Sequence, residues 1–309
     1  MSSIGFRALF GIMRVPFLVL TPACVLLGVA SAVWMGARLN YTHLLLIFIG
    51  ALSAHASVNA LNEYSDYRSG LDLNTERTPF SGGSGTLPLF PEKAGVALMT
   101  GWACLLLTVV IGAYFISAVG TALIPLGVIG LVTILAYTNH ITRNPILCLI
   151  APGLGFGPCM VMGTDYVLCG SYSWTAFFSS LIPFFLVSNL LLLNQFPDVG
   201  PDRSIGRNHI PIRKGRQFAA VLYDIFLVGA YASILIGFLA GAIPAAGLIG
   251  LGTAVIAIPA ARGIARHHDD IPNLVPYMAK NVLITIATPM LLAAGMLWSA
   301  ANYPDLMLR

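Results

Sequence analysis

The chain has 309 residues, of which 57% are hydrophobic and only 9% charged, and its formal net charge is +4. Soluble domains carry about 25% charged residues, so this composition excludes an ordinary soluble protein and indicates a membrane protein. The basic residues are spread over several loops and form no single patch, which argues against nucleic-acid binding.

Nine apolar runs are long enough to cross a bilayer, which requires about 20 mostly apolar residues. They lie near residues 15–37, 44–66, 94–117, 120–138, 145–167, 174–195, 217–241, 245–262 and 278–300. The first run is followed by further spans, which is not typical of a cleaved signal peptide. The sequence therefore predicts an all-α, polytopic membrane protein with nine transmembrane helices around a central cavity. We expect residues 1–309 to form one domain.

The basic residues orient these spans in the membrane. With nine spans, 14 of the 16 Lys and Arg residues fall on the same side as the N-terminus, and only Arg38 and Arg309 fall on the other. Because Lys and Arg are retained in cytoplasmic loops, we expect the N-terminus and the even-numbered loops in the cytoplasm. Three of these loops are long, at about 67–93, 196–216 and 263–277. We expect the first two to form a cytoplasmic cap over the cavity.

Two acidic clusters of nearly the same form follow the second and the sixth spans, within the predicted cap. The first is Asn62, Asp66 and Asp72 in NEYSDYRSGLD, and the second is Asn194, Asp198 and Asp202 in NQFPDVGPD. Mg²⁺ prefers oxygen ligands and is usually held by one or two carboxylates plus substrate phosphates. We therefore predict that the four aspartates are metal ligands and catalytic residues, which together clamp a diphosphate through Mg²⁺.

Cations and amides beside the two clusters complete the predicted site. Arginine offers planar, bidentate donors to phosphate oxygens. The predicted substrate-binding residues are Asn62, Arg77, Asn194, Arg207, Arg213 and Lys214. The alternative for one cluster alone is an acidic helix end paired with neighbouring arginines, but two clusters with Asn at the same offset favour the metal site. The glycine-rich run 81–85 is compatible with a phosphate-binding nest and equally with a flexible loop tip.

Polar residues also recur at helical spacing inside the spans. His55, Asn59, Asn62 and Asp66 share one helix face, and similar stripes are formed by Asn194, Asp198 and Asp202, if that helix persists past Pro197, and by Arg213, Gln217 and Asp224. Polar groups are costly in a bilayer, so three stripes predict a polar pocket that opens on the cytoplasmic side. For His55 and Asn59 taken alone, hydrogen bonding between helices explains the pattern equally well.

These motifs resemble those of the UbiA superfamily of intramembrane prenyltransferases, and the resemblance covers nearly the whole chain, including the opening Arg14-Val-Pro16-Phe17. The stretches NEYSDYRSGLDLNTERTPFSGGSG, GFGPCMVMGTDYV and DRSIGR are similar to the branch that contains 1,4-dihydroxy-2-naphthoate prenyltransferases. The resemblance implies Mg²⁺-dependent transfer of a polyprenyl group from a prenyl diphosphate to a small acceptor within the membrane. In that branch the acceptor is an aromatic quinone precursor. No nucleic acid or protein partner is predicted.

Some residues depart from the family pattern and leave the acceptor open. Asp165-Tyr166 stands where many relatives have an aromatic pair, and the connection 137–143 lacks the proline-rich form common in aromatic-acceptor enzymes. A non-aromatic lipid acceptor, or a transporter of phosphorylated lipids, is therefore the alternative. Candidates to stabilise an allyl cation are Tyr64, Tyr67, Tyr137 and Phe196. We expect Asp224 to pair with Arg213 or Arg216.

Overall fold

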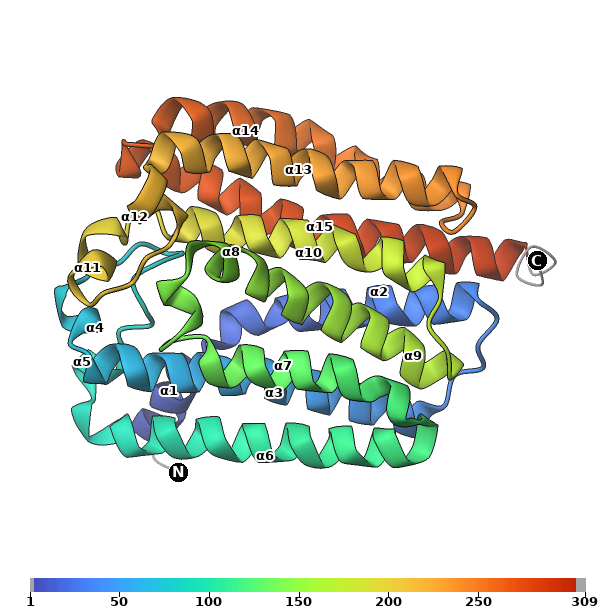
Figure 1. Ribbon diagram of the computed structural model, residues 1–309, viewed down its shortest axis with the longest axis horizontal. Helices are drawn as coiled ribbons and strands as arrows, with labels where there is room; N and C mark the ends of the chain where they lie inside the picture. The colour runs from blue at the N-terminus through green and yellow to red at the C-terminus, as the bar shows by residue number, and fades with distance from the viewer. Residues whose placement is uncertain (1–2, 304–309) are drawn as a thin grey trace.

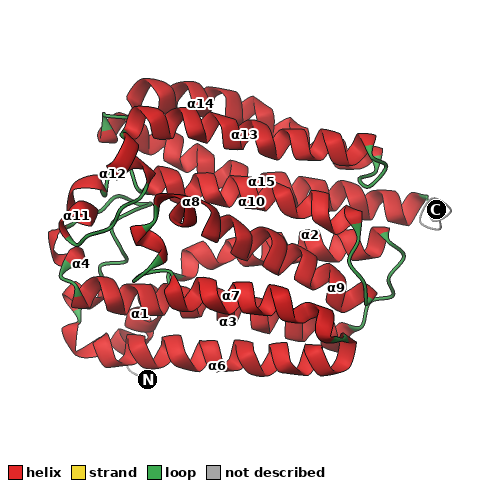
Figure 2. Cartoon of the chain, in the orientation of Figure 1, coloured by secondary structure: helices red, strands yellow, loops and turns green. Residues whose placement is uncertain are grey.

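The structure is a computed structural model that describes residues 3–303. Over this range the regular elements are all helical (Figure 2). Eight helical segments are long and apolar enough to cross a membrane, and a ninth apolar segment, Thr121–Ala136, is shorter. The nine predicted spans thus all correspond to helices, and the prediction of an all-α, polytopic membrane protein is confirmed.

The helices are best followed by their bounds in chain order. They are α1 (Ser3–Ile12), α2 (Leu20–Trp34), α3 (Tyr41–Arg68), α4 (Leu71–Asn74), α5 (Thr86–Leu89), α6 (Ala94–Val119), α7 (Ile124–Ala136), α8 (Pro145–Leu154), α9 (Gly163–Cys169), α10 (Trp174–Asn194), α11 (Val199–Ser204), α12 (Ile210–Lys214), α13 (Arg216–Leu239), α14 (Ala254–His267) and α15 (Ile271–Asn302). Segments of 3₁₀ helix precede α2, α6, α7, α8 and α14, and a π-helical segment, Gly155–Met162, joins α8 to α9.

The long helices run side by side, and the short helices α1, α4, α5, α11 and α12 gather at one end of the bundle, on the left in Figure 1. The predicted cap loops contain α4 and α5 in the first and α11 and α12 in the second, so both loops cover the same end. Helix α15 ends at the opposite end of the bundle (Figure 1). The cap is therefore present, and the cavity entrance described below lies beneath it.

Helix α10 is the most deeply buried span, whereas α6 is among the least buried. The apolar side chains of α10, such as Ile182, Leu186 and Leu193, are fully buried in the main core with residues of α2, α13 and α15. Helix α7 has no buried residue. The bundle is thus organised around α10, with α6 and α7 at its periphery.

The segment from α8 to α9 is distorted because it contains Pro152 and Pro158, whose nitrogens cannot donate helical hydrogen bonds. Glycines let it pack tightly on α10: a Cβ at Gly153 would lie 2.2 Å from the Phe184 carbonyl oxygen, and one at Gly157 would lie 2.4 Å from the Ser180 carbonyl oxygen. Small residues four apart commonly allow such close approach between membrane helices. The close packing fixes the position of the π-helical segment, which forms part of the cavity wall.

Three expectations from the sequence are wrong. The predicted long loop at 263–277 is helical, because α14 continues to His267 and α15 begins at Ile271. Helix α10 ends at Asn194, so Asp198 and Asp202 lie on a separate turn and on α11 instead of continuing its face. The third stripe is interrupted at Gly215, whose φ of 85° separates α12 from α13. At 263–277, charged residues lower the hydropathy of the sequence, but they do not end a helix that extends beyond the bilayer.

Candidate active site

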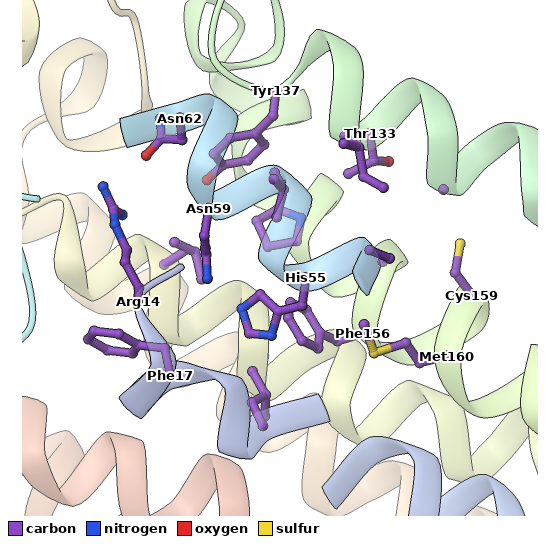
Figure 3. A pocket seen from close by; sticks show the side chains of 18 of the residues that line it. Arg14, Phe17, His55, Asn59, Asn62, Thr133, Tyr137, Phe156, Cys159 and Met160 are labelled. Carbon is purple, nitrogen blue, oxygen red and sulfur yellow. The ribbon is translucent and has the colours of Figure 1, made fainter. Parts of the chain in front are cut away.

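A large cavity of about 920 Å³ extends from the cap into the bundle. Its wall comes from α2, α3, α6, α7, α10 and the segment from α8 to α9, and Figure 3 shows part of it. Eight of the ten predicted site residues line it, namely Asn62, Asp66, Asp72, Arg77, Asn194, Asp198, Asp202 and Arg207. The other two, Arg213 and Lys214, are exposed on α12 and are not among the lining residues. The structure thus brings both acidic clusters to one end of one cavity.

Arg207 joins the two clusters directly. Its Nη2 donates to Asp66 Oδ1, and its Nη1 donates to Asp202 Oδ1 at 2.8 Å. The second oxygen of Asp202 lies 3.0 Å from His209 Nε2. The carboxylates of Asp66 and Asp202, contributed by α3 and α11, therefore face each other across a single guanidinium.

The other two aspartates carry buried carboxylate oxygens without a partner. Asp72 Oδ2 and Asp198 Oδ1 have no hydrogen bond within the described part of the chain. Burial raises the pKa of Asp72 to about 7, with Glu63 and Asp66 adding to the effect, and burial with Asp202 raises the pKa of Asp198 to about 7. Buried carboxylates that lack a cation are unstable as ions, so these two side chains favour a positively charged ligand.

The donor set fits Mg²⁺ held jointly with a phosphorylated substrate. Among residues 3–303, no three His, Cys, Asp or Glu side chains are grouped closely enough to hold a metal without help. Mg²⁺ is commonly bound by one or two carboxylates, with substrate phosphates and water completing its coordination. The unpartnered oxygens of Asp72 and Asp198 are ligands of this kind.

The glycine-rich run lies against the site. Gly82, Gly83 and Gly85 have φ angles of 83°, 72° and 71°, a region that other residues rarely adopt. A Cβ at Gly83 would lie 2.6 Å from Asp72 Oδ1, and one at Gly85 would overlap the Arg77 guanidinium. The run is therefore packed onto two predicted site residues, and only glycine permits this approach.

The sequence did not reveal a buried ion pair beside the site. Arg14, between α1 and α2, donates from Nη2 and Nε to Glu63 Oε2 at 3.0 and 3.2 Å, and Glu63 is fully buried. Glu63 also accepts hydrogen bonds from the backbone and the hydroxyl of Ser84. Arg14 and Glu63 are 49 residues apart, so no local pattern could link them. His209, also missed, holds Asp202 in place.

Of the four aromatic candidates, only Tyr137 lines the cavity. Phe196 is buried in the main core, and Tyr64 and Tyr67 pack in a small cluster under the cap. The Asn62 amide donates to Thr138 Oγ1 at 3.1 Å, which ties α3 to the end of α7 near Tyr137.

Two further aspartates singled out in the sequence, Asp165 and Asp224, are not among the residues that line the cavity. The expected pairing of Asp224 is wrong: its Oδ1 has no partner among the described residues, while Arg216 contacts Asp269 at 3.5 Å. Asp165 accepts a hydrogen bond of 3.0 Å from Ser173, whose hydroxyl caps the start of α10. Asp165 therefore has a structural role at the end opposite the cap.

Comparison with known proteins identifies the family. Residues 19–278 match the UbiA prenyltransferase family. The chain belongs to this family. This UbiA family member is thus a membrane-embedded prenyltransferase, and the resemblance noted from its sequence is confirmed. It is also similar to the 2-carboxy-1,4-naphthoquinone phytyltransferase of Synechocystis sp., with 22% identity over 90% of each chain, which agrees with the predicted naphthoate branch.

Solved structures of UbiA homologues share the fold at low sequence identity. The apo structure of a UbiA homologue from Aeropyrum pernix K1 has a TM-score of 0.70 and 16% identity over 92% of this chain and 98% of that one. A UbiA homologue from Archaeoglobus fulgidus bound to GPP and Mg²⁺ has a TM-score of 0.60 and 14% identity over 93% and 99%. A digeranylgeranylglyceryl phosphate synthase has a TM-score of 0.64 and 14% identity over 95% and 99%.

Proposed function

We propose that the protein transfers a polyprenyl group from a prenyl diphosphate to a small aromatic acceptor, with Mg²⁺ held by Asp66, Asp72, Asp198 and Asp202. The observation that carries this proposal is the position of two aspartate clusters at the polar end of a long cavity whose wall is mostly apolar. The Archaeoglobus homologue bound to GPP and Mg²⁺ and the naphthoquinone phytyltransferase support the same substrate classes.

The polar end of the cavity suits a diphosphate. Mg²⁺, when bound, would neutralise the charge that develops on the diphosphate as it leaves. Arg207 lies between Asp66 and Asp202, so its guanidinium can exchange a carboxylate partner for a phosphate oxygen with little movement. Arg77 lines the same end, and Asn62 and Asn194 offer amide groups there. These residues bind and orient the leaving group.

The apolar part of the cavity suits the prenyl chain and the reaction. Its wall includes Ile47, Ile111, Phe115 and Val167, far from the cap along the spans. This part of the cavity holds the hydrocarbon tail. The allyl cation forms at the first carbon of the prenyl chain, beside the diphosphate, when the carbon–oxygen bond breaks and the diphosphate leaves with the electron pair, and exclusion of water from the cavity protects it. Tyr137 lines the cavity and presents an aromatic ring to that cation. The acceptor ring then forms the new carbon–carbon bond and becomes aromatic again, either by losing a ring proton to a base or by losing its carboxylate as CO₂.

We also propose that the cap faces the cytoplasm. The cap end carries most of the basic residues, among them Arg203, Arg207, Arg213 and Lys214, and basic residues are retained on the cytoplasmic side. Soluble diphosphate is then released toward the cytoplasm, while the prenylated product stays in the bilayer.

A direct assay tests the proposal. Purified protein in nanodiscs is incubated with radiolabelled geranylgeranyl diphosphate, Mg²⁺ or EDTA, and a panel of naphthoate, hydroxybenzoate, homogentisate and glycerol-phosphate acceptors. We expect an Mg²⁺-dependent product with an aromatic acceptor, and a fall of at least about 100-fold in turnover for Asp66→Asn and Asp198→Asn. Arg203→Gln, at an exposed position on α11, is the matched control. Normal turnover in either aspartate variant contradicts the proposed metal site.

A further inference from the structure

Three basic residues of α14 and α15 lie away from the proposed active site. Arg262 and Arg266 are exposed on successive turns of α14, and Lys280 lies half-buried on α15, which packs against α14. None of the three lines the large cavity. Helix α14 ends and α15 begins at the cap end of the bundle (Figure 1), so the three cations share that end.

The depth of these cations follows from helix length. Helix α15 has 32 residues and is about 48 Å long, so it exceeds a hydrocarbon layer of about 30 Å by about 9 Å at each end when centred. Lys280 lies about 14 Å from the start of α15, and Arg262 lies about 8 Å from the end of α14. The three cations are therefore near the boundary between hydrocarbon and lipid headgroups, within reach of their long side chains.

The protein supplies no counterion to this basic cluster. Within residues 3–303, neither Arg262 nor Arg266 forms an ion pair or a side-chain hydrogen bond. Lys280 has no ion pair there either, and its Nζ lies 5.1 Å from the centroid of the Tyr277 ring. Charged groups at the edge of a bilayer are costly without a partner, so the cluster favours an anion from outside the chain.

The turn between α14 and α15 does carry two carboxylates, but both are engaged elsewhere. Asp269 contacts Arg216 at 3.5 Å and lies 3.2 Å from His268. Asp270 accepts a hydrogen bond of 2.7 Å from the Asn273 amide and caps the start of α15. Neither carboxylate neutralises the two arginines of α14.

An open pocket of about 230 Å³ lies at the two arginines. It is lined by Pro259, Arg262, Gly263, Arg266 and Tyr277. A Cβ at Gly263 would lie 2.0 Å from Tyr277 Cε1, so the tyrosine ring occupies the space that a side chain would need. The His267 ring stacks on the same tyrosine, with centroids 5.7 Å apart and planes at 12°. The pocket wall is therefore fixed by contacts between α14 and α15.

The surface below the pocket, toward the middle of the bilayer, is apolar. Val255 and Ile258 precede Arg262 by seven and four residues, which places them on its helix face, and they are 79% and 52% exposed. Leu283, one turn beyond Lys280 on α15, is also exposed. This outer face thus presents cations at the depth of headgroups and apolar side chains at the depth of acyl chains.

We propose that this pocket binds the phosphate of an anionic phospholipid from the leaflet that meets the cap. Arg262 and Arg266 donate to the phosphate oxygens, for which a planar guanidinium is well suited, and Lys280 adds a third positive charge. The acyl chains lie along the apolar face of α14 and α15. Basic pockets between transmembrane helices are suited to anionic headgroups. The inference concerns a site outside the active cavity and does not depend on the proposed prenyl transfer.

A lipid titration tests this inference. Purified full-length protein in detergent is titrated with phosphatidylglycerol or phosphatidylcholine, and native mass spectrometry counts the bound lipids. We expect wild type to bind one phosphatidylglycerol more tightly than phosphatidylcholine. In Arg262→Gln/Arg266→Gln the affinity for phosphatidylglycerol should fall about 30-fold, because each basic residue contributes about fivefold to the attraction for anionic lipid. Lys280→Gln alone should lower it about fivefold.

Two further variants separate a built pocket from general surface charge. Arg143→Gln/Arg203→Gln is the matched control, because it removes two exposed charges from other positions outside the pocket. Its affinity should change less than about twofold, since salt screens separated surface charges. Tyr277→Leu keeps every charge but removes the ring beside Lys280, and it should weaken binding about threefold.

Three outcomes would overturn the inference in variants that melt like wild type. The first is equal affinity of wild type for the two lipids. The second is an equal loss of affinity in the control and in Arg262→Gln/Arg266→Gln, which would assign the effect to general surface charge. The third is complete displacement of phosphatidylglycerol by millimolar glycerol 3-phosphate, which would make a soluble phosphate the ligand of the pocket.

Discussion

Replacement of Arg207 by glutamine tests the geometry of the site without reference to any substrate. The guanidinium bridges Asp66 and Asp202, and the three side chains are only 13%, 7% and 5% exposed. Removing one partner of a buried ion pair costs about 3–5 kcal/mol, and partial exposure together with the His209 contact to Asp202 favours the lower end, about 3 kcal/mol. At about 2 °C per kcal/mol for a chain of this size, the melting temperature in EDTA should fall by about 6 °C.

Mg²⁺ should reverse much of this loss. With the guanidinium removed, Asp66 and Asp202 repel each other and attract a divalent cation, so Mg²⁺ should raise the melting temperature of Arg207→Gln more than that of wild type. Melting is followed by tryptophan fluorescence in detergent at one scan rate, with the exposed Arg203→Gln as control. If Arg207→Gln has the same melting temperature as wild type in EDTA, or if Mg²⁺ raises both melting temperatures equally, Arg207 does not hold the two aspartate motifs together.

Three further predictions concern pH, packing and chain length. Because the pKa values of Asp72 and Asp198 are about 7, against a usual 3.8, the folded protein binds more protons than the unfolded chain between about pH 4 and 7. The melting temperature in EDTA should therefore fall as pH rises through this window, and Mg²⁺ affinity should weaken below pH 7 by up to about tenfold per unit. Gly153→Ala should destabilise the protein by about 1–3 kcal/mol in denaturant titrations, because the new methyl group meets the α10 backbone. Gly155→Ala, which meets open space, should change stability by less than about 0.5 kcal/mol. Gly112→Phe should reduce turnover of geranylgeranyl diphosphate about tenfold relative to geranyl diphosphate in a competition assay, because Gly112 lines the apolar part of the cavity.

Each of these has an outcome that would count against it. A melting temperature that does not change between pH 4 and 7 would mean that the two carboxylates are not buried as described. Equal stability of the Gly153 and Gly155 variants would contradict the close packing of α8 on α10. Equal turnover of both donors by Gly112→Phe would place the prenyl chain elsewhere.

The spans could be predicted because hydropathy over about 20 residues reflects the thickness of the bilayer. The same signal failed at 263–277, since Arg266, His267 and Asp269 are charged or polar yet lie in or beside helices that extend past the apolar layer. It also gave no information on the turn after Asn194, where backbone geometry ends α10. Hydropathy therefore located the segments in the membrane but not the ends of the helices.

The site was predictable where its residues form a local pattern. In both clusters an Asn precedes the first Asp by four residues and a second Asp follows within six, and both clusters line the cavity. The Arg14–Glu63 pair depends on a contact across 49 residues, and Arg213 is exposed on α12, a separate short helix that ends at Gly215. Such features arise only when the chain is folded, so short-range spacing cannot predict them.

The peripheral position of α6 and α7 has a consequence for how such an enzyme can change over time. The cap, α3 and Arg14 carry the charged groups that line the cavity, whereas its far wall is formed largely by two helices with few buried side chains. Substitutions on α6 and α7 can alter the room for the hydrocarbon chain without disturbing the carboxylates. The length of the prenyl chain that is accepted can therefore change independently of the chemistry at the diphosphate. Chain length can diverge among descendants while the diphosphate chemistry stays constant.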